Sequence, residues 1–165
     1  MTIESLTMAR VHLHPKIEKL PFNSCQDEAI QAAHDCYRTK GPNLAPFLNH
    51  PISGLLNVMF DRGDLGPVFM SSGPRSFTAQ IFGAEFARNC AGRETIPDRQ
   101  FGLSIIDSFC EASWTLEPML ERITGKTSGY WVQFDRGLFP TLLADEIPTF
   151  VALLRPRRVL RLVPQ

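Results

Sequence analysis

The chain has 165 residues, with 17 Lys and Arg against 17 Asp and Glu, so its formal net charge at pH 7 is zero. This is the length of one domain. A charged fraction of 21% and a hydrophobic fraction of 44% exclude a disordered chain and predict a globular protein with a core of its own. Because a neutral chain lacks the basic surface of most nucleic-acid binders, we expect no nucleic-acid partner.

Residues 1–20 show neither the apolar segment of a secretory signal nor a membrane span, which needs about 18 consecutive apolar residues. The four cysteines, Cys25, Cys36, Cys90 and Cys110, are far apart and form no CxxC pair. These features predict a cytoplasmic protein with reduced thiols. We divide the chain into an N-terminal extension, residues 1–23, and a single domain, residues 24–165.

The first half of the chain predicts helices followed by a hairpin. Ser24 and Asp27 form a capping box at the start of a helix over residues 24–40. Apolar residues at helical spacing predict a second helix over residues 51–60. After it, residues 68–70 and the strand-forming residues 77–82 flank a Ser-Ser-Gly-Pro turn, which predicts a β-hairpin.

The second half predicts a short helical turn over residues 84–90 and a longer helix over residues 104–123, broken near Leu116 by Pro118. The remaining predicted elements are strands separated by turns at residues 135–137 and 145–146, and they cover residues 130–134, 138–144, 150–154 and 159–163. Pro140 suits an edge or a strand end, because proline cannot donate to a ladder. Helices, two strands, helices and then strands predict an α+β domain with an antiparallel sheet.

Residues 77–93, FTAQIFGAEFARNCAGR, give an aromatic strand ending at Gly83, a short helix, and then Gly92-Arg93. With the order of the elements, this stretch resembles single-domain bacterial PAS proteins. The resemblance implies a five-stranded antiparallel sheet with helices packed on one face, preceded by an N-terminal helix. It also implies a signal-transduction module that is often dimeric through a flanking helix and sometimes holds a small molecule between sheet and helices.

Aromatic and apolar residues supply the candidate sites. Five aromatic residues in or beside the predicted elements can line a pocket for a small apolar ligand, or can simply form a Phe-rich core: Phe69, Phe86, Phe109, Trp114 and Trp131. Ile30, Ala33 and Tyr37 share one face of the first helix, and we predict that this face contacts a partner or a second copy.

The chemical signatures of the common hydrolases, nucleotide binders, zinc proteases and calcium loops are missing from the sequence, so we expect no enzyme. We predict no catalytic residues and no metal site, although His12 and His14 have the spacing of a metal pair in an extended segment. No cofactor can be assigned. The basic cluster Arg155, Arg157, Arg158 and Arg161 is interpreted as a solvated tail, with binding of a phosphate, an acidic partner surface or a nucleic-acid backbone as the alternative.

These features favour a non-enzymatic sensory or protein-interaction module of PAS type, which acts through a protein partner or a homodimer. The alternative is an immunity-type or inhibitor protein that binds and neutralises another protein, because a compact neutral domain without catalytic motifs is equally typical of that class. A third possibility is an enzyme with a diffuse site built from His50, Asp107 and Cys110, for which the sequence offers no positive signal.

Overall fold

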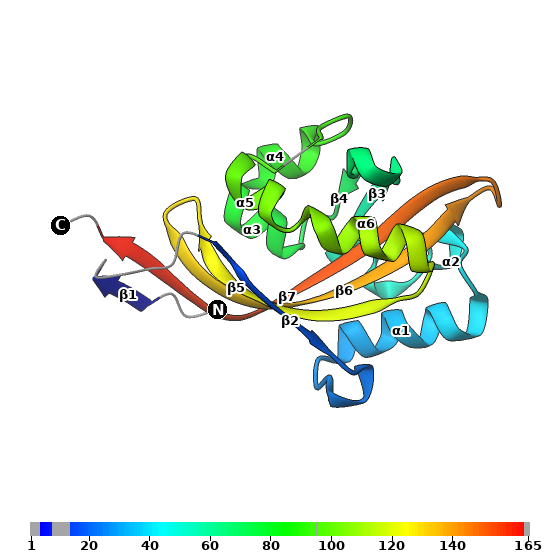
Figure 1. The fold of residues 1–165 in the computed structure, drawn as a ribbon, viewed down its shortest axis with the longest axis horizontal. Helices are drawn as coiled ribbons and strands as arrows, with labels where there is room; N and C mark the ends of the chain where they lie inside the picture. Colours follow the sequence, from blue (N-terminus) through cyan, green and yellow to red (C-terminus); the bar gives the residue numbers. More distant parts are fainter. Residues whose placement is uncertain (1–3, 8–13, 95, 164–165) are drawn as a thin grey trace.

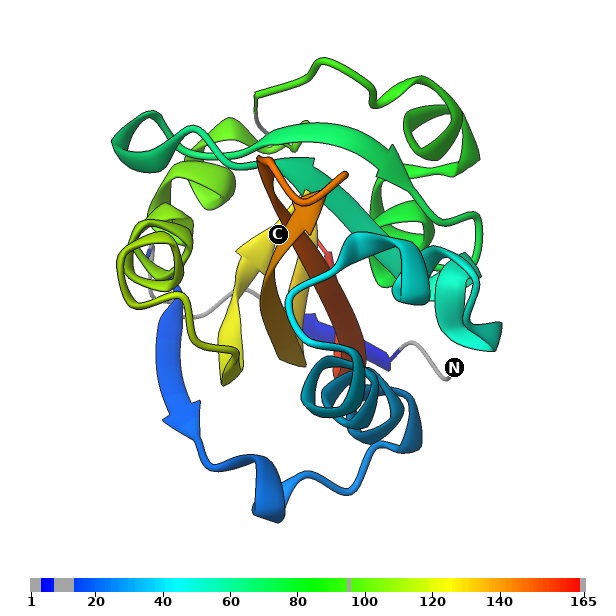
Figure 2. The same cartoon turned by 90° about the vertical axis from the view of Figure 1, so that its right-hand side faces the viewer.

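A computed structural model describes residues 4–7, 14–94 and 96–163 of the chain. An α+β fold is built on one twisted sheet with helices on both of its faces (Figures 1 and 2). The strands run β2-β5-β6-β7-β3-β4, and β1 adds to the far end of β7. Neighbours along this path pair antiparallel, and only β1 pairs parallel among the described strands. The prediction of an α+β domain with an antiparallel sheet is confirmed.

The N-terminal segment contributes strands to this sheet. β1 (Glu4–Thr7) pairs with the end of β7, and β2 (Lys16–Leu20) pairs with β5 at the opposite edge. The short 3-10 helix η1 (Phe22–Ser24) then leads into the first α-helix. Residues of the predicted N-terminal extension therefore complete the sheet of the domain.

Helix α1 (Glu28–Lys40) begins four residues later than predicted. Asp27, and not Ser24, is its N-cap, because the Asp27 carboxylate accepts hydrogen bonds from the backbone N–H groups of Ala29 and Ile30. Gly41, at φ 68°, ends the helix as predicted. Helix α2 (Leu44–Leu48) and the 3-10 helix η2 (Pro51–Leu55) follow on the same face of the sheet.

The predicted helix over residues 51–60 is wrong, because its second half is strand β3 (Leu56–Phe60). This strand is covered on both faces, so almost every residue is apolar and the alternation that identifies a half-exposed strand is missing. β3 forms a hairpin with β4 (Val68–Ser72) through the 3-10 helix η3 (Gly63–Leu65). The hairpin therefore lies one element earlier than predicted.

Residues Phe77–Phe82 form helix α3, not the predicted strand. Ser76 caps it by accepting the N–H of Ala79 at 3.1 Å, which outweighs the strand propensity of its aromatic and β-branched residues. The predicted short helix is confirmed as α4 (Ala84–Asn89). Helices α5 (Arg99–Ser104) and α6 (Ile106–Thr115) follow, and the chain breaks at Leu116, at φ 55°, as the downstream Pro118 predicted.

The end of the predicted 104–123 helix is wrong, because residues after the break form strand β5 (Met119–Thr127). β5 starts a three-stranded meander with β6 (Tyr130–Leu143) and β7 (Ile147–Val163). The predicted turn at residues 135–137 is also wrong, because β6 runs through it unbroken. The turn between β6 and β7 is confirmed, with Ala144 and Asp145 at positive φ.

Pro140 occupies an edge position of the sheet, as predicted. β5 pairs with β6 only as far as Met119 and Leu138, so at Pro140 the strand β6 has a neighbour, β7, on one side only. Gly137, by contrast, is needed for packing: a Cβ there would lie 2.9 Å from the Phe139 ring and 3.4 Å from Cγ2 of Ile30. Gly137 thereby lets α1 approach the sheet closely.

The helices cover both faces of the sheet, so the predicted packing on one face is wrong. On one face, α1, α2 and η2 pack on a core that includes Ile30, Phe47, Phe139 and Leu153. On the other face, α3 to α6 cover two further core clusters, around Phe150 and around Phe134. Figure 2 shows this arrangement end on.

Candidate functional site

A cavity of about 80 Å³ lies between the sheet and helices α3, α5 and α6. One water molecule needs about 10–15 Å³ of such space, so the cavity has room for several waters or a small ligand. Its lining is almost wholly apolar. The strands contribute Met59, Phe69, Phe134 and Leu154 among others. The helices contribute Phe77, Ile81, Phe101 and Phe109, and Ile105 lines the cavity from the junction of α5 and α6.

A buried polar network fixes one side of this cavity. The side-chain amide of Asn57 donates to Oγ1 of Thr78 at 2.8 Å, and its oxygen accepts from Oγ of Ser72 at 2.6 Å. Ser72 also lies 3.0 Å from Oγ of Ser76, the N-cap of α3. Since all of these side chains are buried, their hydrogen bonds hold the start of α3 on β3 and β4. Asn57 and Thr78 line the cavity from this anchored end.

An ion pair lies beneath α6 on the same face of the sheet. Nε and Nη2 of Arg136 donate to Oε2 of Glu121 at 3.1 and 2.6 Å, and the two residues stand directly opposite each other in β5 and β6. The side chains are 1% and 0% exposed. The Arg136 guanidinium carbon also lies 4.8 Å from the centre of the Phe109 ring.

This ion pair is incompletely satisfied. Within the described part of the chain, Nη1 of Arg136 and Oε1 of Glu121 are buried side-chain atoms without a hydrogen-bond partner. Arg136 lines the cavity, so a residue with a buried and unpartnered nitrogen belongs to its wall. Such groups are rare in folded proteins, and water or a ligand commonly completes them.

The structure brings together only part of the predicted ligand site. Phe69 and Phe109 line the cavity, whereas Phe86 packs edge-on behind Phe69 at a ring distance of 5.6 Å and does not reach it. Trp114 is 76% exposed on α6 and donates to Asp64. Trp131 lies elsewhere on β6, beneath the guanidinium of Arg158. The prediction is therefore wrong for Phe86, Trp114 and Trp131 as lining residues.

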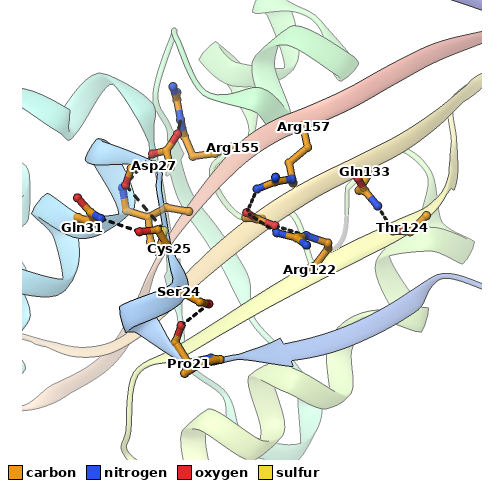
Figure 3. Close-up of polar contacts among 12 residues, drawn as sticks. Pro21, Ser24, Cys25, Asp27, Gln31, Arg122, Thr124, Gln133, Arg155 and Arg157 are labelled. Atoms are coloured by element: carbon orange, nitrogen blue, oxygen red, sulfur yellow. Dashed lines mark hydrogen bonds and ion pairs between the residues drawn. The ribbon is translucent and has the colours of Figure 1, made fainter.

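The face of the sheet opposite the cavity carries a second polar cluster beside α1 (Figure 3). Nearly buried Asp135 accepts two hydrogen bonds from Arg122, at 2.9 and 3.3 Å, and one from Nη1 of Arg157 at 2.9 Å. The side-chain amide of Gln133 donates to Thr124 farther along the same strands. The hydrogen bond to Asp135 raises the pKa of Arg122 further, which keeps its charge fixed.

We call the exposed part of the sheet around Asp135, Arg122, Gln133 and Arg157 the open face. Asp27 links α1 to it through hydrogen bonds. Its Oδ2 accepts from Nε of Arg155 at 2.8 Å while Oδ1 caps the helix. The interpretation of the Arg155–Arg161 cluster as a solvated tail is wrong, because these residues belong to β7, and Arg155 and Arg157 are held in ion pairs.

The predicted interface on α1 is not an exposed surface. Ile30 and Ala33 are fully buried against the sheet, and half-buried Tyr37 packs on Phe139 and donates to the carbonyl of Leu116. A helical stripe of apolar residues serves the core here, so the prediction that Ile30 and Ala33 meet a partner is wrong.

The described residues do not assemble the other chemistries weighed from the sequence. Burial raises the pKa of the Cys25, Cys36, Cys90 and Cys110 thiols, all of them free, so none is activated as a nucleophile. Among the described residues, no three His, Cys, Asp or Glu side chains gather as metal ligands. His14 is exposed, and His12 lies outside the described residues.

The possible site of His50, Asp107 and Cys110 is also not assembled. His50 accepts the N–H of Ile52 at the start of η2, whereas Asp107 and Cys110 belong to α6 on the opposite face of the sheet.

Among the described residues, no helix is both long enough and apolar enough to cross a membrane.

Comparison with models of known protein families, with curated proteins and with solved structures finds no match. Sequence reasoning missed Glu121, Arg136 and Asp135. The available signal was an acid next to a base, Glu121-Arg122 and Asp135-Arg136, inside otherwise apolar segments.

Proposed function

We propose that this protein is a non-enzymatic sensory module of PAS type, which holds a small, largely apolar ligand and acts through contact with a protein partner or a second copy. The observation that carries the proposal is the cavity between the sheet and helices α3, α5 and α6, with an almost wholly apolar lining. Apolar cavities of ligand size with few polar groups are typical of small-molecule sites.

The order of the elements supports the PAS part of the proposal. The β3–β4 hairpin precedes α3 to α6, which precede the β5–β6–β7 meander, and α1 comes before them all as a flanking helix. β7, the last strand, returns to lie beside β3, the first strand of the hairpin. This is the element order that the sequence resemblance implies, with three differences: residues 77–82 form helix α3 and not its second strand, helices cover both faces of the sheet, and β1 and β2 extend the sheet.

The surface that we propose for partner contact is the open face of the sheet around Asp135. The face of α1 with Ile30 and Ala33, which the sequence predicts as the interface, is buried. Arg122, Gln133 and Arg157 present charge and hydrogen-bonding groups on the open face, and no described helix covers them (Figure 3). Strand β6 contributes residues both to the cavity and to the proposed contact surface. A shift of β6 on ligand binding would therefore move the contact surface directly.

The test is a native mass spectrum of the protein purified from its natural source, recorded beside a spectrum of the same sample after denaturation. We expect an extra mass that denaturation removes. Ala152 is buried in the cavity floor, so Ala152→Leu should fill the space and lose this mass, whereas the exposed Ala91→Leu should retain it. No extra mass, or its retention in Ala152→Leu, would contradict the ligand part of the proposal.

The same spectra test the contact part. A mass of two chains supports contact between copies, and Gln133→Arg, which adds a further positive side chain beside Arg122, Arg157 and Arg158, should then return a single chain. An unchanged two-chain mass in Gln133→Arg would show that the open face is not the contact surface.

A further inference from the structure

The unpartnered nitrogen of Arg136 points to the chemistry of the ligand. Glu121 engages Nε and Nη2, which leaves Nη1 as the guanidinium nitrogen without a partner in the described part of the chain. The side chain is 1% exposed, so bulk water does not satisfy this group. Arg136 lines the cavity and Glu121 does not, so Arg136 is the member of the ion pair that a ligand in the cavity would meet.

We propose that the cavity takes a small, uncharged and mostly apolar molecule with one hydrogen-bond acceptor, such as a carbonyl or ether oxygen, which accepts from Nη1 of Arg136. This inference rests on the proposed function and names the ligand class of the same site. The apolar body contacts the aromatic and aliphatic lining, and the acceptor pairs the buried side-chain donor that is left open in the described part of the chain.

The charge of the ligand follows from Glu121. Its carboxylate already neutralises Arg136, so an anionic ligand would place a second negative charge beside a buried carboxylate in an apolar space. A cation would face the guanidinium itself. A pure hydrocarbon would fill the space and leave Nη1 without a partner. An uncharged ligand with a hydrogen-bond acceptor is therefore the class of molecule that this cavity favours.

Packing also fixes where the acceptor must lie. The Phe109 ring lies against the guanidinium, and the two bonds to Glu121 hold its plane. Nη1 therefore cannot swing toward another acceptor without breaking this ion pair. A donor held in one direction selects ligands by the position of their oxygen as well as by its presence.

The experiment compares two probes of nearly identical shape, cyclopentanone and methylenecyclopentane, of which only the ketone has an acceptor. Binding is followed by NMR at the methyl groups of Ile81 and Ile105, which line the cavity. We expect the ketone to bind wild type about 12- to 160-fold more tightly, the range of one net hydrogen bond to a charged group. In the double variant Glu121→Leu with Arg136→Met, the two affinities should become equal.

A second readout does not depend on any variant. The side-chain ¹⁵N resonances of Arg136 should shift on addition of the ketone and stay in place on addition of the alkene. Equal affinities of the two probes for wild type, or no ketone-specific shift at Arg136, would overturn the inference while leaving a ligand-binding module intact. Tighter binding of cyclopentanecarboxylate than of the ketone would overturn the uncharged class. If neither probe perturbs these methyl groups, both the inference and the ligand part of the proposed function fail.

Discussion

Asp135 and Arg136 are consecutive residues of β6 whose ion pairs lie on opposite faces of the sheet, each with the directly opposite residue of β5. Asp135 pairs with Arg122 on the open face, and Arg136 pairs with Glu121 beneath α6. Because side chains alternate along a strand, one dipeptide contributes to both the cavity wall and the proposed contact surface. The two regions are therefore separated by the thickness of one strand.

The buried ion pair predicts a large loss of stability when only one partner is removed. Arg136→Met leaves the Glu121 carboxylate buried without its cation, so we expect the free energy of unfolding to fall by about 3–5 kcal/mol. Urea unfolding followed by circular dichroism measures this change.

The matched control is the double variant Glu121→Leu with Arg136→Met, which removes both charges together. An apolar pair of similar volume leaves no uncompensated charge, so its stability should be close to that of wild type. A double variant as unstable as Arg136→Met would show that the charge pair itself holds the sheet and α6 together.

The N-cap of α1 is tested by comparing Asp27 with Ser24. Asp27→Ala removes the acceptor for two helix N–H groups and the partner of Arg155, and it should cost about 0.5–2 kcal/mol of unfolding free energy. Ser24→Ala, at the capping residue that the sequence predicts, should change stability by less than about 0.5 kcal/mol, because its exposed hydroxyl bonds only the carbonyl of Pro21. If Ser24→Ala lowered the thermal unfolding temperature more than Asp27→Ala, the helix would begin at Ser24, as the sequence predicts.

Ile30 distinguishes a core role from an interface role. Ile30 is fully buried between α1 and the sheet, in the core that includes Phe139. Ile30→Ala should therefore lower the free energy of unfolding by about 2–5 kcal/mol. Leu65→Ala, at a side chain 73% exposed, serves as the control and should change stability little. If Ile30→Ala instead left the unfolding curve in place and weakened self-association in light scattering, the helix face would be an interface after all.

His34 predicts a small pH dependence of stability. Its ring stacks on Phe22 at 3.9 Å, and burial, followed by the charge of Arg38, lowers its pKa from the ordinary 6.5. The folded protein thus binds a proton less readily than the unfolded chain, so this contribution is present above pH 6.5 and is lost as the pH falls through the lower folded pKa. The urea midpoint should fall between about pH 7.5 and 5. His34→Gln should flatten this decline, and an equal decline in the variant would assign it to other groups.

The sequence predicts the fold class, helix α1, strand β4, helix α4, the break at Leu116 and the last hairpin turn, because caps, breakers and periodicity act locally. It fails at β3, where burial on both faces removes the alternation of a strand. It fails at α3, where a serine cap and packing on the sheet outweigh strand propensity.

The candidate site was harder to predict, because it depends on pairing across strands. Asp135-Arg136-Gly137 has the composition of a turn, and only the register with β5 reveals that each charge has an opposite partner and that Gly137 makes room for Ile30. Aromatic side-chain type alone points to Phe69 and Phe109, and it points equally to Trp114, which lies at the surface.

The most direct test of the central claim is a crystal structure of the protein under xenon pressure, since xenon occupies apolar cavities without needing a specific ligand. We predict a xenon site lined by Phe77, Phe109 and Phe134, between the sheet and helices α3, α5 and α6, and its loss in Ala152→Leu. A core in which these side chains close the space and exclude xenon would contradict the claim that this fold holds a ligand.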